Sequence, residues 1–245
     1  MALYLYAIIN RPDGDAEFLP QIGSGLQEQP LQLVTKSTLA AVVSDWGQKG
    51  SRKPSKTNEA ELWRHEQVVE AVMAQTTILP VRFGTILTDE TRVQQLLVEH
   101  QASFHADLAR LTGRVEMGLR VLWNPPSPQS PELSQISQSD QEMVATPGRN
   151  YLREQAQRLQ AEQAVRTEGQ TLVDELAAQL VPFVVDTRMQ VLQTERLLLS
   201  AAYLVERNAI ESLARQIDIL RQRYPTLSFL LSGPWPAYHF VSKFS

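Results

Sequence analysis

The chain has 245 residues, a length that suits one large or two medium domains, and 43% of them are hydrophobic, enough to build packed cores. A formal net charge of -4 argues against the basic surface with which proteins attract nucleic-acid backbones. The absence of cysteine excludes disulfides, thiolate metal sites and thiol nucleophiles. We therefore expect a folded protein with no cofactor and no nucleic-acid partner.

Neither secretion nor membrane insertion is supported by the sequence. Residues 1–10 lack a basic start and a small-residue cleavage site, so we expect no secretory signal and a cytoplasmic location. The longest apolar run, Leu197–Val205, is much shorter than the ~20 residues that cross a bilayer as a helix. We therefore expect no membrane partner, and any association with a surface to be peripheral.

The amino-terminal segments have the composition of strands. Leu3–Ile9 is apolar, is rich in aromatic and β-branched residues and is followed by turn residues, which predicts a central strand. Leu31–Val34 and Leu39–Trp46 are two strand-like runs separated by a few residues, and they predict a hairpin. Residues 47–56 are polar and basic with nothing apolar to dock them, so we expect a mobile loop there.

Two helices and two further strands are predicted after this loop. Residues 58–75 begin with a capping-box-like Asn and Glu and carry an apolar stripe, which predicts a helix. Residues 79–87 predict a strand, in which Pro80 marks the beginning or an edge because proline has no N–H for the ladder. Residues 89–113 predict a helix that ends at a glycine, and residues 114–123 alternate as a closing strand.

The order of these elements predicts the fold class. A strand, a hairpin and then alternating helices and strands suit one sheet with helices packed on one face. We therefore predict an α+β protein whose residues 1–124 form a ferredoxin-like domain. Residues 125–148 are rich in Pro, Ser and Gln and have few large apolar side chains, which predicts a linker and a domain boundary.

Residues 149–245 predict a second α+β domain. Arg149–Leu180 is a long polar helix with a weak apolar repeat, which we interpret as coiled-coil-like and largely exposed. Leu197–Val205 is apolar enough for a central strand buried on both faces. Residues 208–225 predict a helix that Asn208 caps and Pro225 ends, and Leu227–Leu231 predicts a last strand.

No pattern in the sequence predicts catalysis or metal binding. His65 and His100 lie on apolar helix stripes, which is typical of buried, hydrogen-bonded histidines. His65 and Glu66 begin like a zinc protease motif, but Val69 stands where the second histidine would be needed. Residues 47–56 lack the Gly-Lys-Ser/Thr ending of a phosphate-binding loop. We expect no catalytic residue and no metal site.

Two segments are unusual for a protein without a site. In residues 77–85, Arg82 lies on the strand face opposite Val81 and Phe83, where a buried arginine would need a carboxylate such as Glu66. Residues 232–240 place aromatic side chains between prolines, and such a tail either folds back on its core, which we favour, or meets a partner. The candidate partner-binding residues, each with an intramolecular alternative, are Arg82, Phe83, Trp235 and Tyr238.

Five segments of the chain stand out together by their order and spacing. They are Leu3-Tyr-Leu-Tyr-Ala-Ile8, His65-Glu-Gln-Val-Val-Glu-Ala-Val72, Ile78-Leu-Pro-Val-Arg-Phe-Gly-Thr85, Gly113-Arg-Val-Glu-Met-Gly-Leu119 and Gly233-Pro-Trp-Pro236. In that order and spacing they resemble the GvpF/GvpL family of gas vesicle proteins. Where the family tail usually continues Pro-Tyr-Ser-Phe, this chain has Ala237-Tyr238-His239-Phe240.

The resemblance implies an accessory or structural protein of the gas vesicle, associated with its shell, that binds the shell protein GvpA and other accessory proteins in nucleation and assembly. It implies no catalysis, and it implies the same two α+β domains. Two alternatives stay open: a small-molecule or phosphoryl enzyme with residues 49–56 as a lid, and a scaffold in which Arg149–Leu180 pairs with another helix. A concave polar pocket would favour an enzyme, and an exposed apolar patch would favour an assembly factor.

Overall fold

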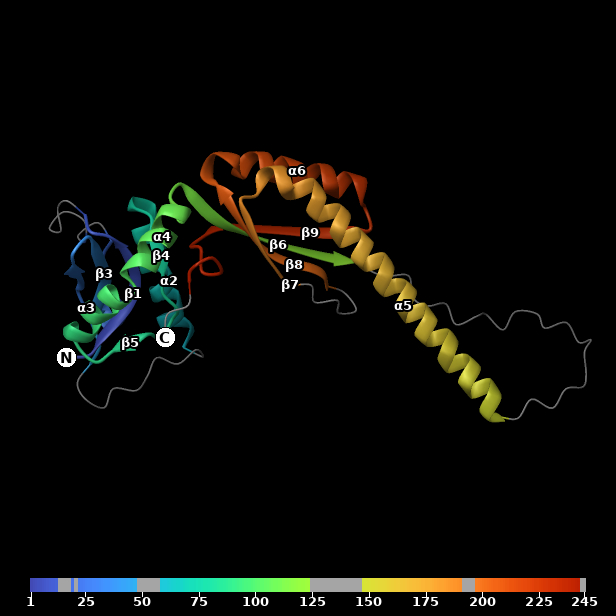
Figure 1. The fold of residues 1–245 in the computed structure, drawn as a ribbon, viewed down its shortest axis with the longest axis horizontal. Coiled ribbons are helices and arrows are strands. Elements are labelled where there is room, and N and C mark those ends of the chain that lie inside the picture. The colour runs from blue at the N-terminus through green and yellow to red at the C-terminus, as the bar shows by residue number, and fades with distance from the viewer. Residues whose placement is uncertain (13–18, 20–21, 48–57, 124–146, 191–196, 243–245) are drawn as a thin grey trace, which may run out of the picture.

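The computed structural model describes residues 1–12, 19, 22–47, 58–123, 147–190 and 197–242. Within these residues the protein is α+β, with helices packed on two antiparallel sheets (Figure 1). The helices are α2 (Glu59–Gln75), α3 (Glu90–Glu99), α4 (Gln101–Leu111), α5 (Pro147–Leu180) and α6 (Ile210–Arg223). The strands are β1 (Leu3–Asn10), β2 (Leu31–Lys36), β3 (Leu39–Asp45), β4 (Ile78–Pro80), β5 (Ile86–Leu87), β6 (Arg114–Trp123), β7 (Asp186–Gln190), β8 (Leu197–Glu206) and β9 (Leu227–Trp235).

The first sheet has β1 at its centre, as predicted, in the order β2-β3-β1-β4 with β5 also beside β1. Its helices lie on both faces, so the prediction that they cover one face is wrong. Leu5 and Ile8 face a core shared with α3 and α4, whereas Tyr4 and Tyr6 face a core shared with α2. The physical reason lies in the composition of β1, because a continuous apolar run needs cover on both sides.

The strand predicted over residues 79–87 is interrupted. β4 pairs with the second half of β1 and β5 with its beginning, and residues 81–85 form a loop between them. Two local causes combine here: Pro80 has no N–H for the ladder, and Gly84 adopts a φ of 86°, which a residue with a side chain rarely takes.

The closing strand is correctly placed in sequence but belongs to the other sheet. β6 lies between β8 and β9, in the order β7-β8-β6-β9. The unit β6-α5-β7-β8-α6-β9, with α5 and α6 on the same face, is the ferredoxin-like arrangement. The layout predicted for residues 1–124 is therefore found in this second unit. Gly113, with a φ of 73°, turns the chain from α4 into β6.

The long helix α5 packs only near its carboxyl end among the residues whose side chains are described. Val173, Leu176 and Leu180 are buried with residues of α6 against the second sheet, and the beginning of α5 extends away from the sheet (Figure 1). Pairing of α5 with another helix stays a prediction. The predicted linker at 125–148 lies almost wholly outside the described residues, so the division into domains at that point also stays a prediction.

A tight contact between Gly25 and the Tyr6 side chain allows the packing against the first sheet to be tested directly. The Tyr6 hydroxyl accepts the Leu26 N–H at 2.7 Å and shares a hydrogen bond of 2.9 Å with the Ser44 hydroxyl. A Cβ at Gly25 would lie 2.5 Å from this hydroxyl. We predict that Gly25→Ala lowers the free energy of unfolding by about 1–3 kcal/mol, because the overpacked Tyr6 must move. Urea unfolding followed by circular dichroism measures this loss.

The control for this substitution is Gly118→Ala. The close neighbour of a Cβ at Gly118 is Ser232 Oγ at 2.8 Å. This hydroxyl is held only by two long hydrogen bonds, to the Gly118 carbonyl at 3.4 Å and from the Trp235 indole at 3.3 Å, so moving it costs less than moving the Tyr6 ring. Equal losses of stability in the two variants would show that the Tyr6 contact is not the cause.

Candidate functional site

Two of the four predicted partner-binding residues meet at one buried histidine. His65, on the inner face of α2, is fully buried. The Phe83 ring lies edge-on to its imidazole, with centroids 5.6 Å apart, and the Tyr238 hydroxyl lies 3.3 Å from Nε2. Arg82 and Trp235 lie apart from this cluster, and both side chains are exposed.

The hydrogen bonds of His65 fix the position of its proton. The Tyr4 hydroxyl accepts the Gly84 N–H at 2.8 Å, so its own hydrogen is free to donate to His65 Nδ1 at 3.0 Å. Nε2 then carries the proton and donates to the Val81 carbonyl at 3.1 Å. Burial lowers the pKa of His65 to about 4, although the bond to Val81 opposes the shift, so the ring is neutral at pH 7.

Tyr238 extends this network to the surface of α2. Its hydroxyl donates to both carboxylate oxygens of Glu66, at 3.2 and 3.3 Å. Burial raises the pKa of Glu66, the bond from Tyr238 lowers it and the charge of Glu70 raises it, with a net shift upward. The network therefore joins β1, the loop at residues 81–85, α2 and the carboxyl-terminal tail.

The tail after β9 folds back onto the protein, as favoured from the sequence. The His239 N–H donates to Glu116 Oε2 at 3.0 Å, and the His239 ring lies 2.6 Å from Glu116 Oε1. The Ser242 N–H donates to Asp107 Oδ2 at 2.7 Å. Burial raises the pKa of Asp107, but this bond and the Arg110 guanidinium outweigh burial, so the pKa lies below its ordinary value.

Phe240 anchors the tail between the two sheets. Its ring is 1% exposed and belongs to a core that includes residues of α4 and Leu204 of β8. The Arg188 guanidinium lies over the ring, 5.5 Å from its centroid, and Arg110 donates to the Phe240 carbonyl. The tail is therefore part of the hydrophobic core.

The expected pair between Arg82 and Glu66 is not formed. Glu66 accepts the Tyr238 hydroxyl instead, and Arg82 is exposed at the edge of a cavity of 300 Å³. Residues of the loop, α3 and the tail line this cavity: Pro80, Val81, Arg82, Thr85, Leu87, Arg92, Leu96, Tyr238, Val241 and Ser242. Trp235, which is 44% exposed, donates its indole N–H to Ser232 Oγ at 3.3 Å.

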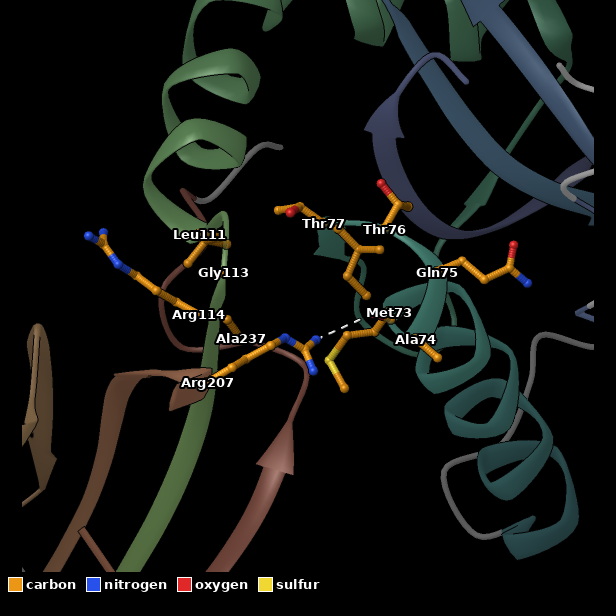
Figure 2. Close-up of a pocket in the computed structure, with 11 residues that line it drawn as sticks. Met73, Ala74, Gln75, Thr76, Thr77, Leu111, Gly113, Arg114, Arg207 and Ala237 are labelled. Carbon is orange, nitrogen blue, oxygen red and sulfur yellow. Dashed lines mark hydrogen bonds between the residues drawn. The ribbon is translucent and has the colours of Figure 1, made fainter. Parts of the chain in front are cut away.

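A second cavity, of 350 Å³, lies between the end of α2 and the start of β6. Arg207 reaches across it toward α2, where it donates to the Met73 carbonyl at 3.4 Å, while Arg114 points the other way (Figure 2). Guanidinium groups commonly satisfy the last carbonyls of a helix in this way. The cavity therefore lies where elements of the two sheets meet, and the described residues that line the two cavities include no aspartate, glutamate or histidine.

The described part of the chain contains no group of three His, Asp or Glu side chains suited to hold a metal ion. Among its helices, none has the length and apolarity needed to span a membrane.

Comparison with known proteins gives the family. The model of the gas vesicle synthesis protein GvpL/GvpF family matches residues 2–242. The chain belongs to this family. It is 27% identical to gas vesicle protein L of a Streptomyces species, over 97% of this chain and 92% of that protein. It is 24% identical to gas vesicle protein F1 of Halobacterium salinarum, over 98% of this chain and 92% of that protein.

Solved structures of GvpF proteins share the fold. GvpF from an Anabaena species superimposes with a TM-score of 0.76 and 20% identity, over 100% of this chain and 97% of that one. GvpF from Microcystis aeruginosa gives 0.74 and 20%, over 99% of both chains. The resemblance inferred from the sequence segments is thus confirmed.

Membership of the GvpL/GvpF family also explains which segments carried the resemblance. Three of the five quoted segments supply Tyr4, His65 and Val81, which bond to one another in the network. The sequence analysis missed Tyr4 and treated His65 as structural, although both lie within quoted segments. No local signal in the sequence shows that these segments converge, because the bonded residues are 61 and 16 positions apart.

Proposed function

We propose that the chain is an accessory protein of the gas vesicle, associated with the shell, that binds the shell protein GvpA and other accessory proteins in nucleation and assembly. The observation that carries this proposal is the family match over residues 2–242. The relatives bear the names of gas vesicle proteins L and F, not of enzymes. We infer that this chain likewise acts by binding and not by catalysis.

The surface of the protein supports a binding role. Large apolar side chains are exposed at several places, including Trp63 at 67% and Leu230 at 59%. Exposed apolar side chains indicate a binding surface where they adjoin one another, as Leu62 and Trp63 do on α2. The alternative, an enzyme with a basic lid, gains no support from the two cavities because neither is lined by an acid or a histidine. The lid itself, residues 49–56, falls outside the described residues.

The proposed function predicts capture of the shell protein. The full chain, immobilised on a resin, is expected to retain purified GvpA, and washed vesicles are expected to retain the chain. An unrelated protein of similar net charge serves as the control for nonspecific capture. Absence of the chain from washed vesicles, together with no capture of GvpA, would contradict the proposal.

A further inference from the structure

The outward face of α2 carries an exposed tryptophan. On the inward face, His65, Val68, Val69 and Val72 are buried against the first sheet. On the outward face, Trp63 is 67% exposed and its neighbour Leu62 is 39% exposed. A tryptophan is a large apolar side chain that proteins usually bury for the most part, and tryptophan is enriched among the residues that dominate binding energy.

Acidic side chains surround this tryptophan. Glu59, Glu66 and Glu70 lie along the same side of α2 as Trp63, given 3.6 residues per turn. We call this set, with Leu62 and Trp63, the Trp63 face. Glu66 and Glu70 are one turn apart, where like charges repel. This repulsion contributes, after burial, to the raised pKa of Glu66.

No described basic side chain neutralises the Trp63 face. The nearest arginine in sequence, Arg64, is turned away, where its guanidinium bonds to Glu28 Oε1 at 2.7 Å. The described residues include no salt bridge to Glu59, Glu66 or Glu70. An apolar centre whose negative charges pair with no described basic side chain is complementary to a ligand with the opposite pattern, an apolar stripe flanked by positive charges.

We propose that the Trp63 face of α2 binds an amphipathic segment of a partner protein in which lysine or arginine side chains flank an apolar stripe. The face runs from Glu59 to Glu70 and is about 16 Å long at 1.5 Å per residue, so it matches about three turns of a partner helix. Its negative charge disfavours nucleic acid and anionic lipid as occupants. The inference refines the proposed function by describing the chemistry of a bound partner, but its test is separate.

A synthetic helix of leucine and lysine, about 14 residues long, is the probe for this face. Fluorescence anisotropy of the labelled peptide with the full chain measures the Kd, with a leucine and glutamate peptide for comparison. We predict that Trp63→Ala weakens binding of the basic peptide about tenfold and that Glu70→Gln weakens it about threefold. Binding is also expected to weaken as salt is added, because exposed charges are screened.

The control variants are Ile219→Ala and Glu211→Gln on α6, whose side chains are also exposed. Both should bind the basic peptide like the original chain, and the melting midpoint of every variant should be unchanged. Equal weakening in the α6 variants, or equal affinity for the acidic peptide, would overturn the proposal. Stronger binding of the basic peptide after four basic residues of the chain are replaced by serine would also overturn it, because those residues would then occupy the Trp63 face themselves. The four residues are Lys49, Arg52, Lys53 and Lys56.

A second measurement separates this inference from the proposed function. Capture of GvpA that survives Trp63→Ala and Glu70→Gln leaves the proposed function standing and shows that the shell protein does not bind through this face. If these variants lose binding of the basic peptide and the original chain captures no GvpA, the Trp63 face is supported as a binding site and the shell protein is contradicted as its partner.

Discussion

Phe240→Ala is expected to lower the free energy of unfolding by about 3–5 kcal/mol, the usual cost of emptying the site of a buried phenylalanine. The ring is 1% exposed and packs with Leu204 of β8 and residues of α4, so its loss leaves a cavity where the two sheets approach each other. The Arg188 guanidinium would also lose the ring face that it covers. Urea unfolding followed by circular dichroism measures the change.

Trp235→Ala is the matched control, since Trp235 ends β9 directly before the tail and is 44% exposed. It should cost less than Phe240→Ala, because close to half of its surface stays in water in the folded protein. If both variants lost the same stability, the tail would not be anchored through Phe240. If Trp235→Ala instead left stability unchanged but weakened capture of GvpA, Trp235 would be a binding residue, as the sequence analysis allowed.

The tail matters because its neighbours come from distant parts of the chain. Tyr238 bonds to Glu66 of α2, His239 bonds to Glu116 of β6 and Ser242 bonds to Asp107 of α4. A change in the tail is therefore felt by both sheets. The aromatic side chains of residues 232–240 accordingly divide into the buried Phe240, the half-buried Tyr238 and the exposed Trp235, and contact of Tyr238 or Trp235 with a partner stays a prediction.

Local features of the fold were predictable from the sequence because their causes are local. Asn58 Oδ1 accepts the Glu61 N–H at 3.4 Å, so the cap predicted there is confirmed. Asp89 Oδ1 caps α3 in the same way by accepting the Arg92 N–H at 2.8 Å. The cap predicted at Asn208 is wrong. Residues 207–209 form a short 3-10 turn there, and α6 begins without a side-chain cap.

Features that depend on distant pairing were not predictable from one sequence. The alternation of β6 predicts a strand with one buried face, but nothing local says which sheet it joins. Its partners β8 and β9 lie more than 70 residues further along the chain. The prediction that helices cover one face of the first sheet is wrong for the same reason. The apolar run of β1 predicts a buried central strand, but nothing local indicates that α2 covers its second face.

In the candidate site, too, the local features were predictable from the sequence and the long-range contacts were not. His65 was correctly interpreted as a buried, hydrogen-bonded histidine, because its position on an apolar stripe is a local signal. Its bonds to Tyr4 and Tyr238 join residues 61 and 173 positions apart, which no spacing rule detects. Arg82 was expected to be paired if buried. It is exposed because the strand opens into a loop at that point.

The stability of the protein is expected to fall by about 2 kcal/mol between about pH 7.5 and about pH 5 because of His65 alone. The pKa of this ring is about 4 in the folded protein and about 6.5 when it is solvated. Between these values the unfolded chain binds the proton and the folded protein does not, so acidification favours unfolding. This contribution is complete above about pH 6.5 and is lost progressively down to about pH 4.

His65→Gln removes the titrating group and is expected to flatten this part of the pH profile, although the variant is less stable at neutral pH because the bond from Tyr4 is lost. Glu66 acts in the opposite direction, since its raised pKa lets the folded protein bind a proton first. It is present in both proteins and cancels in their difference. His105→Gln, which replaces a ring that bonds to Thr38 at the surface, is the control for exchanging a histidine for glutamine. If His65→Gln kept the full acid sensitivity as well, the buried histidine would not be its source.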